Sequence, residues 1–459
     1  MPFDPTIASI RFGVGLSPVV AAPASLDAML AQLAGPDVAA AAVPIAPYGQ
    51  AYPSLADFRD AGRAVNDARG TDDEQAALDH RDVLRAAGRE AVGANLAAEM
   101  ARCVMTPDGL RERLVRFWAD HFTVRAVNGT SRHLVSPYIE EAIRPHVAGR
   151  FADMLKAVVT SPMMIAFLDQ HQSMGPNSPT AQRRDRGLNE NLARELLELH
   201  TLGVGGAYTQ DDVRQLAELL TGITFNAQRG FFFRDVQAEP GAETVLGVEY
   251  GGEDARLEDV FAALDDLALH PDTARHLARK MAVYFVAAEP DATLVDAMAV
   301  AYSGSGGDLM AMTRAMLRHQ AAWGATYLKV KQPVDFVSSA LRALNVPVEL
   351  LTGAGLSAVR SVLQRPLGVM GQTYQSPVGP DGWPEDAESW ITPQGMAGRI
   401  TWAMERPEQL LDRLPDPREF VYHALGPTPP EAVVFAAGAA ETLSDGIGVI
   451  LASAAFQRR

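Results

Sequence analysis

The sequence predicts a mainly α-helical fold, and three observations support this prediction. Apolar residues recur at helical rather than alternating spacing along most of the 459-residue chain. The helix-favouring residues Ala, Leu, Glu, Arg and Met are abundant. Only residues 223–250 break the pattern. We therefore expect one large multi-helix domain over residues 1–459 with a small β-hairpin insertion near 223–250, and a subdivision near residues 223–256 is the alternative.

The expected elements follow from these patterns in chain order. A long amphipathic helix is predicted over residues 71–104. Thr106 and Pro107 have the residue types of an N-cap and a first-turn proline, so the next helix is expected to begin there. Further helices are predicted over residues 134–147, 150–160, 188–202, 209–222, 257–269, 271–287, 290–302, 307–319, 332–345, 355–365, 393–404 and 430–454.

Residues 223–250 and three further stretches are expected to be non-helical. The first contains β-forming residues around Gly230 and a turn signal at Pro240 and Gly241, which predict one or two hairpins. Residues 35–55, 171–187 and 371–393 are rich in Gly, Pro, Asn and Ser. Loops longer than about 12–15 residues are uncommon in a domain and are often functional.

Composition and charge exclude several classes of protein. Hydrophobic residues make up 47% and charged residues 21%, as in soluble globular proteins. No apolar run approaches the roughly 18 residues of a membrane-spanning helix. The net charge of -16 argues against nucleic acid as a partner. Cys103 is the only cysteine, so a disulfide within one chain is excluded.

The first residues, MPFDPTIASIRFGVGLSP, lack the pattern of a secretory signal. We therefore expect a cytoplasmic location. Periplasmic location by co-export with a signal-bearing partner is the alternative.

The helix expected over residues 188–202 has a continuous polar arc of Glu190, Asn191, Arg194, Glu195 and Glu198. One interpretation is a solvated face with ion pairs four residues apart. The other is a site in which Asn191, Glu195 and Glu198 hold Mg²⁺, Ca²⁺ or substrate hydroxyls, because hard cations prefer oxygen ligands.

Two histidines are expected on apolar helix faces. His200 lies in the apolar arc of its helix, and His121 lies among aromatic residues, whereas Arg113, Arg116 and Asp120 are expected on the wet side. The two histidines could meet in the core and form a metal or acid/base site with a carboxylate, or each could serve as a structural hydrogen-bonding group.

Two loops contain candidate ligand-binding residues. Arg183, Arg184 and Arg186 precede Asn189 at an expected helix start, where backbone N–H groups favour an anion or an acidic partner; pairing with nearby acidic residues is the alternative. In the 371–393 loop, Tyr374, Trp383 and Trp390 form either a binding shelf or anchors to the core.

Several uncommon strings occur in a fixed order. They are RFGVGLSP (11–18), RFWADHFTV (116–124), GPNSPTAQRRDRGLNENLARELLELHTLGVGGAYTQDDV (175–213), LTGITF (220–225), EPGAETVLG (239–247) and SPVGPDGWPEDAESW (376–390). Together they resemble the bacterial family known as domain of unknown function 1800. The resemblance implies a single large helical domain, often encoded beside a second family similar to sulfatases and alkaline phosphatases. The chain has Ala238 and Glu243 where the family usually shows a His and a basic residue.

Three functions are consistent with these patterns. The first is a partner- or ligand-binding protein that acts with an exported sulfatase-like neighbour, with Arg183, Arg184, Arg186, Asn189, Asn191 and Trp383 in contact with the ligand. The second is a metal-assisted hydrolase, whose site is built from two helices and a divalent metal. Its candidate catalytic residues are His121, His200, Glu195 and Glu198, and its candidate ligands are Asn191, Glu195 and Glu198. A third is a structural protein whose polar helix stabilises the core.

Overall fold

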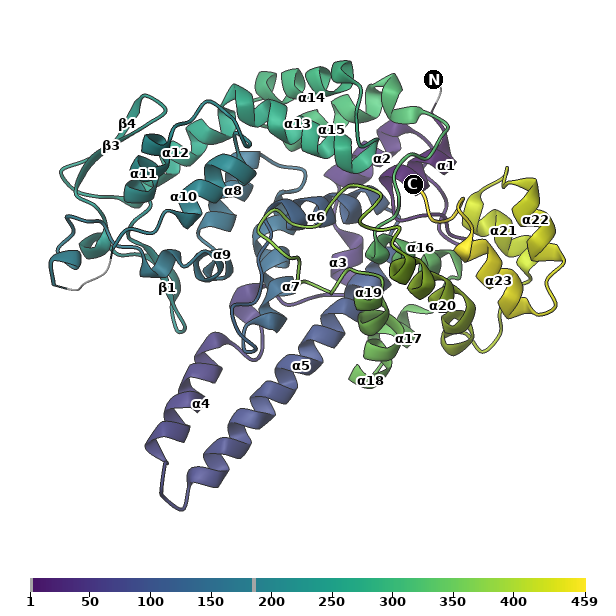
Figure 1. Ribbon diagram of the computed structural model, residues 1–459, viewed down its shortest axis with the longest axis horizontal. Coiled ribbons are helices and arrows are strands. Elements are labelled where there is room, and N and C mark those ends of the chain that lie inside the picture. Colours follow the sequence, from purple (N-terminus) through teal and green to yellow (C-terminus); the bar gives the residue numbers. More distant parts are fainter. Residues whose placement is uncertain (1–2, 184–186) are drawn as a thin grey trace.

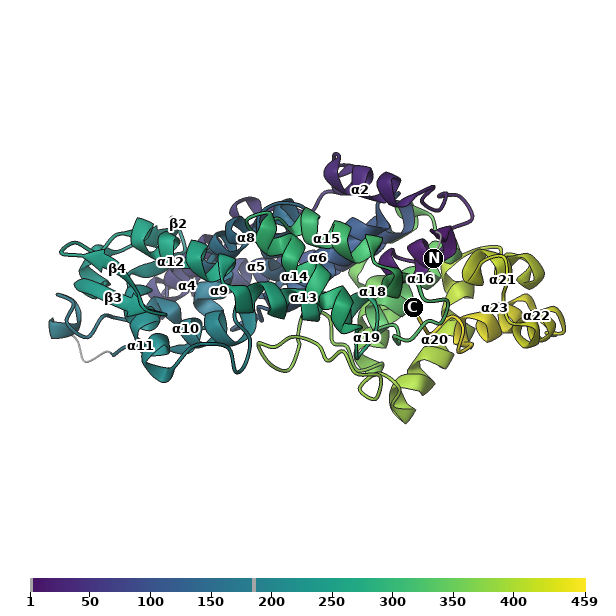
Figure 2. The same ribbon diagram turned by 90° about the horizontal axis from the view of Figure 1, so that it is seen from above.

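Helices dominate the computed structural model, which describes residues 3–183 and 187–459 (Figure 1). The predicted mainly α-helical class is confirmed. Within these residues the β-structure consists of two antiparallel hairpins, which lie at the opposite end of the molecule from the C-terminal helices (Figure 2). Their strands are β1 (Ile223–Asn226), β2 (Gly230–Phe233), β3 (Gly241–Val245) and β4 (Val248–Gly252).

The predicted hairpin region thus holds two hairpins, but the turns lie elsewhere. Leu246 and Gly247 connect β3 and β4, and both have positive φ angles, as a tight two-residue turn requires. Pro240 precedes β3 and Gly241 is its first residue, so these two residues do not form the turn.

The N-terminal region contains a projecting arm of two antiparallel helices, α4 (Leu55–Asp67) and α5 (Glu74–Met105) (Figure 1). The long helix α5 confirms the prediction over residues 71–104, whereas α4 was not predicted. Ser54 begins α4 with a capping box to Asp57. The other N-terminal helices are α1 (Pro5–Ile7), α2 (Leu26–Ala34) and α3 (Val38–Ala42).

The central region is built from α6 (Gly109–His121), α7 (Val135–Tyr138), α8 (Phe151–Val159), α9 (Pro162–Phe167), α10 (Asn191–Glu195), α11 (Gln210–Leu219), α12 (Leu257–Leu269), α13 (Pro271–Phe285), α14 (Ala292–Gly304) and α15 (Leu309–Arg318). The side chain of Asp108 accepts a hydrogen bond from the backbone N–H of Arg111 and caps α6. The predicted N-cap at Thr106 is therefore wrong by two residues.

The C-terminal region comprises α16 (Pro333–Ala343), α17 (Val348–Thr352), α18 (Leu356–Val359), α19 (Arg365–Val369), α20 (Pro393–Leu410), α21 (Pro417–Leu425), α22 (Glu431–Gly438) and α23 (Leu443–Ala452). The helix predicted over residues 430–454 is divided into α22 and α23. The 371–393 loop connects α19 to α20.

Short π-helical segments interrupt three of the predicted helices. They are η4 (Ile139–Ile143), η8 (Leu196–His200) and η11 (Arg360–Gln364), and a further one, η1 (Ala8–Phe12), follows α1. A π-turn adds a residue to the helical turn and shifts the phase of the faces beyond it. Short 3-10 segments are η2 (Tyr48–Gln50), η3 (Arg132–Leu134), η5 (Arg144–His146), η6 (Gln170–Gln172), η7 (Ala181–Arg183), η9 (Asp235–Gln237) and η10 (Gln320–Trp323).

Two clusters of buried apolar residues form the core. The larger one joins α6, α8 and α12–α15, and the other joins the inner part of α5 to α16 and α20–α23. Arg342 of α16 is buried and donates to the carbonyl oxygens of Cys103, Val104 and Thr106 at the end of α5. This contact fixes α16 beside the junction of α5 and α6. Among the described residues, no helix combines the length and apolarity needed to span a membrane.

Candidate functional site

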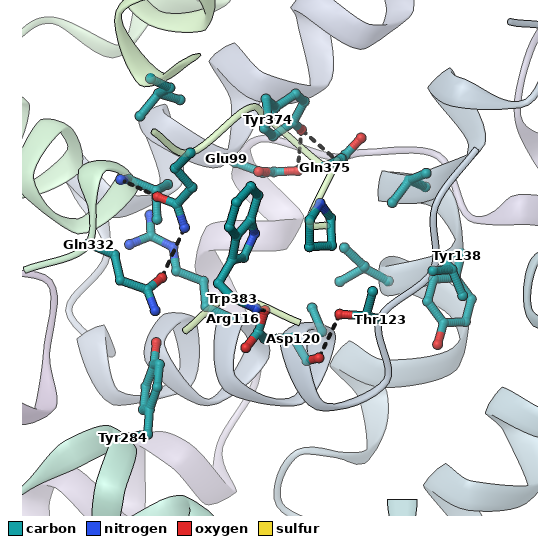
Figure 3. Close-up of a pocket in the computed structure, with 18 residues that line it drawn as sticks. Glu99, Arg116, Asp120, Thr123, Tyr138, Tyr284, Gln332, Tyr374, Gln375 and Trp383 are labelled. Atoms are coloured by element: carbon teal, nitrogen blue, oxygen red, sulfur yellow. Dashed lines mark hydrogen bonds between the residues drawn. The ribbon is translucent and has the colours of Figure 1, made fainter. Parts of the chain in front are cut away.

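A cavity of about 130 Å³ lies where α5, α6, α7, α13 and the 371–393 loop meet (Figure 3). We call it the Glu99–Asp120 cavity. Its polar and aromatic lining residues are Glu99, Arg116, Asp120, Thr123, Tyr138, Tyr284, Gln332, Gln372, Tyr374, Gln375 and Trp383. Its other lining residues are Ala119, Val124, Val135, Ile139, Val334, Leu367 and Pro377. Such a mixture of apolar walls and a few converging polar groups is typical of small-molecule sites.

Glu99 reaches the cavity from α5. Its Oε1 accepts hydrogen bonds from Ser136 Oγ (2.8 Å) and the Tyr374 hydroxyl (2.7 Å). Its Oε2 receives no hydrogen bond from the described residues and is accessible to solvent. Burial raises the pKa of Glu99, whereas the two hydrogen bonds and the Arg116 charge act in the opposite direction. Glu99 is thus held by one oxygen and exposes the other.

Asp120 stands on the last turn of α6 and is held in the same way. Its Oδ1 accepts the backbone N–H of Trp383 at 2.8 Å, and its Oδ2 receives no hydrogen bond from any described residue. Burial raises the pKa of Asp120 to about 7. The Trp383 N–H and the Lys280 ammonium favour its charged form, whereas Glu385 and Asp381 oppose it.

The 371–393 loop closes tightly over Asp120. Gly382 has a φ angle of +84°, and a Cβ atom there would lie 2.6 Å from Asp120 Oδ1. Arg125 donates to the carbonyl oxygen of Val378 at 3.0 Å, and Lys329 donates to that of Glu385 at 2.6 Å. A glycine is therefore required where the loop meets the carboxyl group.

Arg116 is the only Lys or Arg among the lining residues, and its guanidinium is paired with Asp335. Its Nη1 donates to Asp335 (2.8 Å) and Ser338 (3.1 Å), and its Nη2 contacts Cys103 Sγ at 2.9 Å. Asp335 also pairs with the buried Arg113. The lining residues therefore provide two carboxyl groups and no cation without a partner.

The prediction that Arg113, Arg116 and Asp120 lie on a wet helix face is wrong. Arg113 is 1% exposed, and the other two are half-buried. This face of α6 packs on α16 and the 371–393 loop, where Asp335 compensates the arginines. The guanidinium of Arg113 also stacks on the Tyr284 ring at 4.6 Å.

The aromatic residues of the loop lie in two kinds of position. Tyr374 and Trp383 line the cavity, as a binding shelf would. Trp390 is 3% exposed and donates from Nε1 to the carbonyl oxygen of Pro384, as an anchor would.

His121 and His200 lie together in the core, with their ring centroids 5.9 Å apart, and each is 1% exposed. His121 Nε2 lies 3.1 Å from the backbone oxygen of His200, and His276 Nε2 lies 3.0 Å from that of Leu199. These carbonyls end η8, so two histidines cap it as neutral donors. Burial and Lys280 lower the pKa of His200 to about 3 and that of His276 to about 4. Neither His121 nor His200 lines the Glu99–Asp120 cavity.

The polar arc of α10 and η8 forms ion pairs. Arg194 contacts Glu190 at 3.1 Å and Glu198 at 3.2 Å, and Asn191 is exposed. Burial raises the pKa of Glu195, as do the charges of Glu198 and Asp381. In the described parts of the chain, no group of three or more His, Cys, Asp or Glu side chains is placed to hold a metal ion.

The arginine-rich loop is described only in part. Arg184 and Arg186 lie outside the described residues, and Arg183 is exposed. The side chain of Asn189 is hydrogen-bonded within the protein: its Oδ1 accepts the N–H of Asn191 and its Nδ2 donates to the carbonyl oxygen of Leu168.

The two departures from the family pattern lie at the hairpins. Ala238 is buried. Glu243 is 7% exposed beside Glu218, and burial together with this carboxylate raises its pKa to about 7. A carboxyl group thus occupies the position where the family usually shows a basic residue.

Trp383 was predicted from the sequence as a candidate ligand-binding residue, and it lines the cavity, but neither Glu99 nor Asp120 was predicted as a site residue. A signal was present, because the strings 116–124 and 376–390 each contribute a partner to the contact between Asp120 and Trp383. Glu99 had no such signal, since its partners Ser136 and Tyr374 are distant in sequence.

Fold and cavity define a mainly α-helical protein with a partly enclosed site that contains two carboxyl groups. A family model described as "Protein of unknown function (DUF1800)" matches residues 8–458. The chain belongs to this family. No curated protein and no solved structure matched the chain.

Proposed function

We propose that the protein binds a small molecule in the Glu99–Asp120 cavity. The observation that carries the proposal is the state of the two carboxyl groups. Each has one oxygen fixed by protein donors and one that is accessible and has no donor among the described residues. Buried polar groups are normally satisfied, so two free acceptors at one cavity favour a ligand that donates hydrogen bonds.

The size of the cavity limits the ligand. An apolar cavity of about 150 Å³ is large enough for benzene. A cavity of about 130 Å³ therefore suits a group of about six non-hydrogen atoms. The rings of Tyr138, Tyr284, Tyr374 and Trp383 supply flat walls for it.

Screening a library of small fragments by ligand-observed NMR tests the proposal. An Ala119→Leu variant adds three carbon atoms to the cavity wall and should abolish binding of the hits. Ala157→Leu is the matched control, because Ala157 is a half-buried helical alanine at a separate pocket. Hits that bind both variants equally well, or no hits at all, would contradict the proposal.

Three sequence-based predictions remain proposals. They are action beside an exported sulfatase-like partner, a cytoplasmic location and the absence of nucleic acid among the ligands. Purification from native cells tests them together. A stable sulfatase-like partner, recovery in the cytoplasmic fraction and no bound nucleic acid are the expected results.

The metal-assisted hydrolase is a second proposal. Elemental analysis of protein purified without chelators tests it. One divalent metal per chain, lost on substitution of Glu195 or Glu198, would support it.

A further inference from the structure

The charge balance of the Glu99–Asp120 cavity is negative. Glu99 and Asp120 line it, and the charge of Arg116 is compensated by Asp335. Lys280 of α13 acts on Asp120, and it has no ion pair or hydrogen bond within the described residues. Asp381 and Glu385 of the 371–393 loop also act on Lys280 and Asp120. Glu385 is paired with Lys329 at 2.8 Å, whereas Asp381 forms no ion pair within the described residues, so it adds negative charge near Lys280 and Asp120.

Both carboxyl groups lose solvation, and neither forms an ion pair within the described residues, although the charges of Arg116 and Lys280 act on them from a distance. Burial is the largest influence on each and favours the protonated form. A positively charged group placed between them would restore the missing compensation. An anion would meet two carboxyl groups, and its binding would be opposed.

The walls of the cavity also suit a cation. The faces of Tyr and Trp attract ammonium groups within about 6 Å of the ring centroid. Tyr138, Tyr374 and Trp383 line the cavity, whereas the Tyr284 ring already has the guanidinium groups of Arg113 and Arg459 at 4.6 Å from its centroid. The accessible oxygens of Glu99 and Asp120 accept N–H groups. Aromatic faces combined with free carboxylate oxygens recognise an amine better than a hydroxyl group.

We propose that the ligand of the Glu99–Asp120 cavity is a small organic amine that carries a positive charge, held by these two carboxylates and the aromatic walls. This inference rests on the proposed small-molecule function and names the class of the ligand. The cavity volume selects amines of about six non-hydrogen atoms, such as 1,4-diaminobutane.

Isothermal titration calorimetry with 1,4-diaminobutane tests the inference, and 1,4-butanediol serves as the uncharged match. The amine remains charged between pH 6 and 8, whereas Asp120 changes from mainly protonated to mainly ionised. Affinity for the diamine should therefore rise about tenfold between pH 6 and 8. At pH 6, binding of the diamine should release about one proton from Asp120 per diamine bound. Titrations in two buffers with different ionisation enthalpies measure this proton release.

The variants Asp120→Asn and Glu99→Gln keep the shape of each side chain and remove its charge. Each should weaken diamine binding at least tenfold, and Asp120→Asn should remove the rise with pH. Asp412→Asn, at an exposed position far along the chain, should bind as the wild type does. Circular dichroism establishes that each variant is folded.

The outcomes separate this inference from the proposed function. If the diol binds as tightly as the diamine, or if fragment hits are all neutral or anionic, the cation inference is wrong and small-molecule binding stands. Diamine binding without proton release and without loss in Asp120→Asn would also overturn the inference. If neither the diamine nor any fragment binds, the proposed small-molecule function and the cation inference are both wrong.

Discussion

Replacing Asp120 with Asn should change the pH dependence of stability in a predictable direction. Burial raises the pKa of Asp120 from the ordinary value of 3.8 to about 7 in the folded protein. Between these values the folded state binds a proton that the unfolded state has released, so stability falls as pH rises. This loss of stability is absent below pH 3.8, where Asp120 is protonated in both states, and it reaches its full size above about pH 7, where Asp120 is ionised in both states.

The size of the effect follows from the same values. At about 1.36 kcal/mol per pH unit, a rise from 3.8 to about 7 corresponds to about 4 kcal/mol. This figure is an upper limit, because water reaches the carboxyl group through the cavity. Asn keeps an oxygen that accepts the Trp383 N–H and does not ionise. The free energy of unfolding of the variant should exceed that of the wild type by at most about 2 kcal/mol at pH 5 and at most about 4 kcal/mol at pH 8.

Urea unfolding of both proteins between pH 5 and 8 measures the difference. Glu243 also has a pKa raised to about 7, but it is present in both proteins and does not act on Asp120, so its contribution cancels in the comparison. Asp412→Asn controls for the loss of one charge. A stability difference that does not change with pH, or a variant less stable than the wild type at pH 8, would refute the reasoning.

Three further substitutions test the arrangement around the cavity. Asp335→Ala leaves the buried Arg113 and the half-buried Arg116 without their carboxylate, so it should lower the free energy of unfolding in urea by about 3–5 kcal/mol. Asp82→Ala breaks an exposed ion pair with Arg85 and should lower it by less than about 1 kcal/mol. Equal losses in the two variants would contradict this prediction. Gly382→Ala should detach the 371–393 loop and increase its cleavage in limited proteolysis, unlike Gly355→Ala, where a Cβ meets no atom within 4 Å; unchanged cleavage would show that the loop tolerates a side chain. His121→Phe leaves the carbonyl of His200 unpaired and should cost about 1–3 kcal/mol without changing the metal content; loss of a stoichiometric metal would instead favour the ligand role.

The sequence was sufficient for the helical class and for most long helices, because apolar periodicity reports which face is buried. It was misleading for α6. Arg113 and Asp120 have the composition of a wet face, yet their partners Asp335 and Trp383 lie more than 200 residues further along the chain. Local spacing contains no information about such pairs.

The π-turns explain a second kind of error. A helical wheel assumes a constant turn, but η8 changes the phase between Glu195 and His200. The burial of His200 was predicted correctly because it depends on its immediate apolar neighbours. Its partners, His121 and His276, cap the carbonyls of η8, and the position of such a cap depends on how three separate helices pack.

The helix α5 joins the exposed arm to the cavity and imposes a strict spacing on the sequence between them. Gly93 packs so closely under Leu356 that a Cβ would lie 2.7 Å from its Cδ1, and Glu99 follows six residues later. Each inserted residue turns a helix by about 100° and lengthens it by about 1.5 Å. A single insertion between Gly93 and Glu99 would therefore direct the carboxylate away from the cavity, so this segment should tolerate substitutions far better than changes of length.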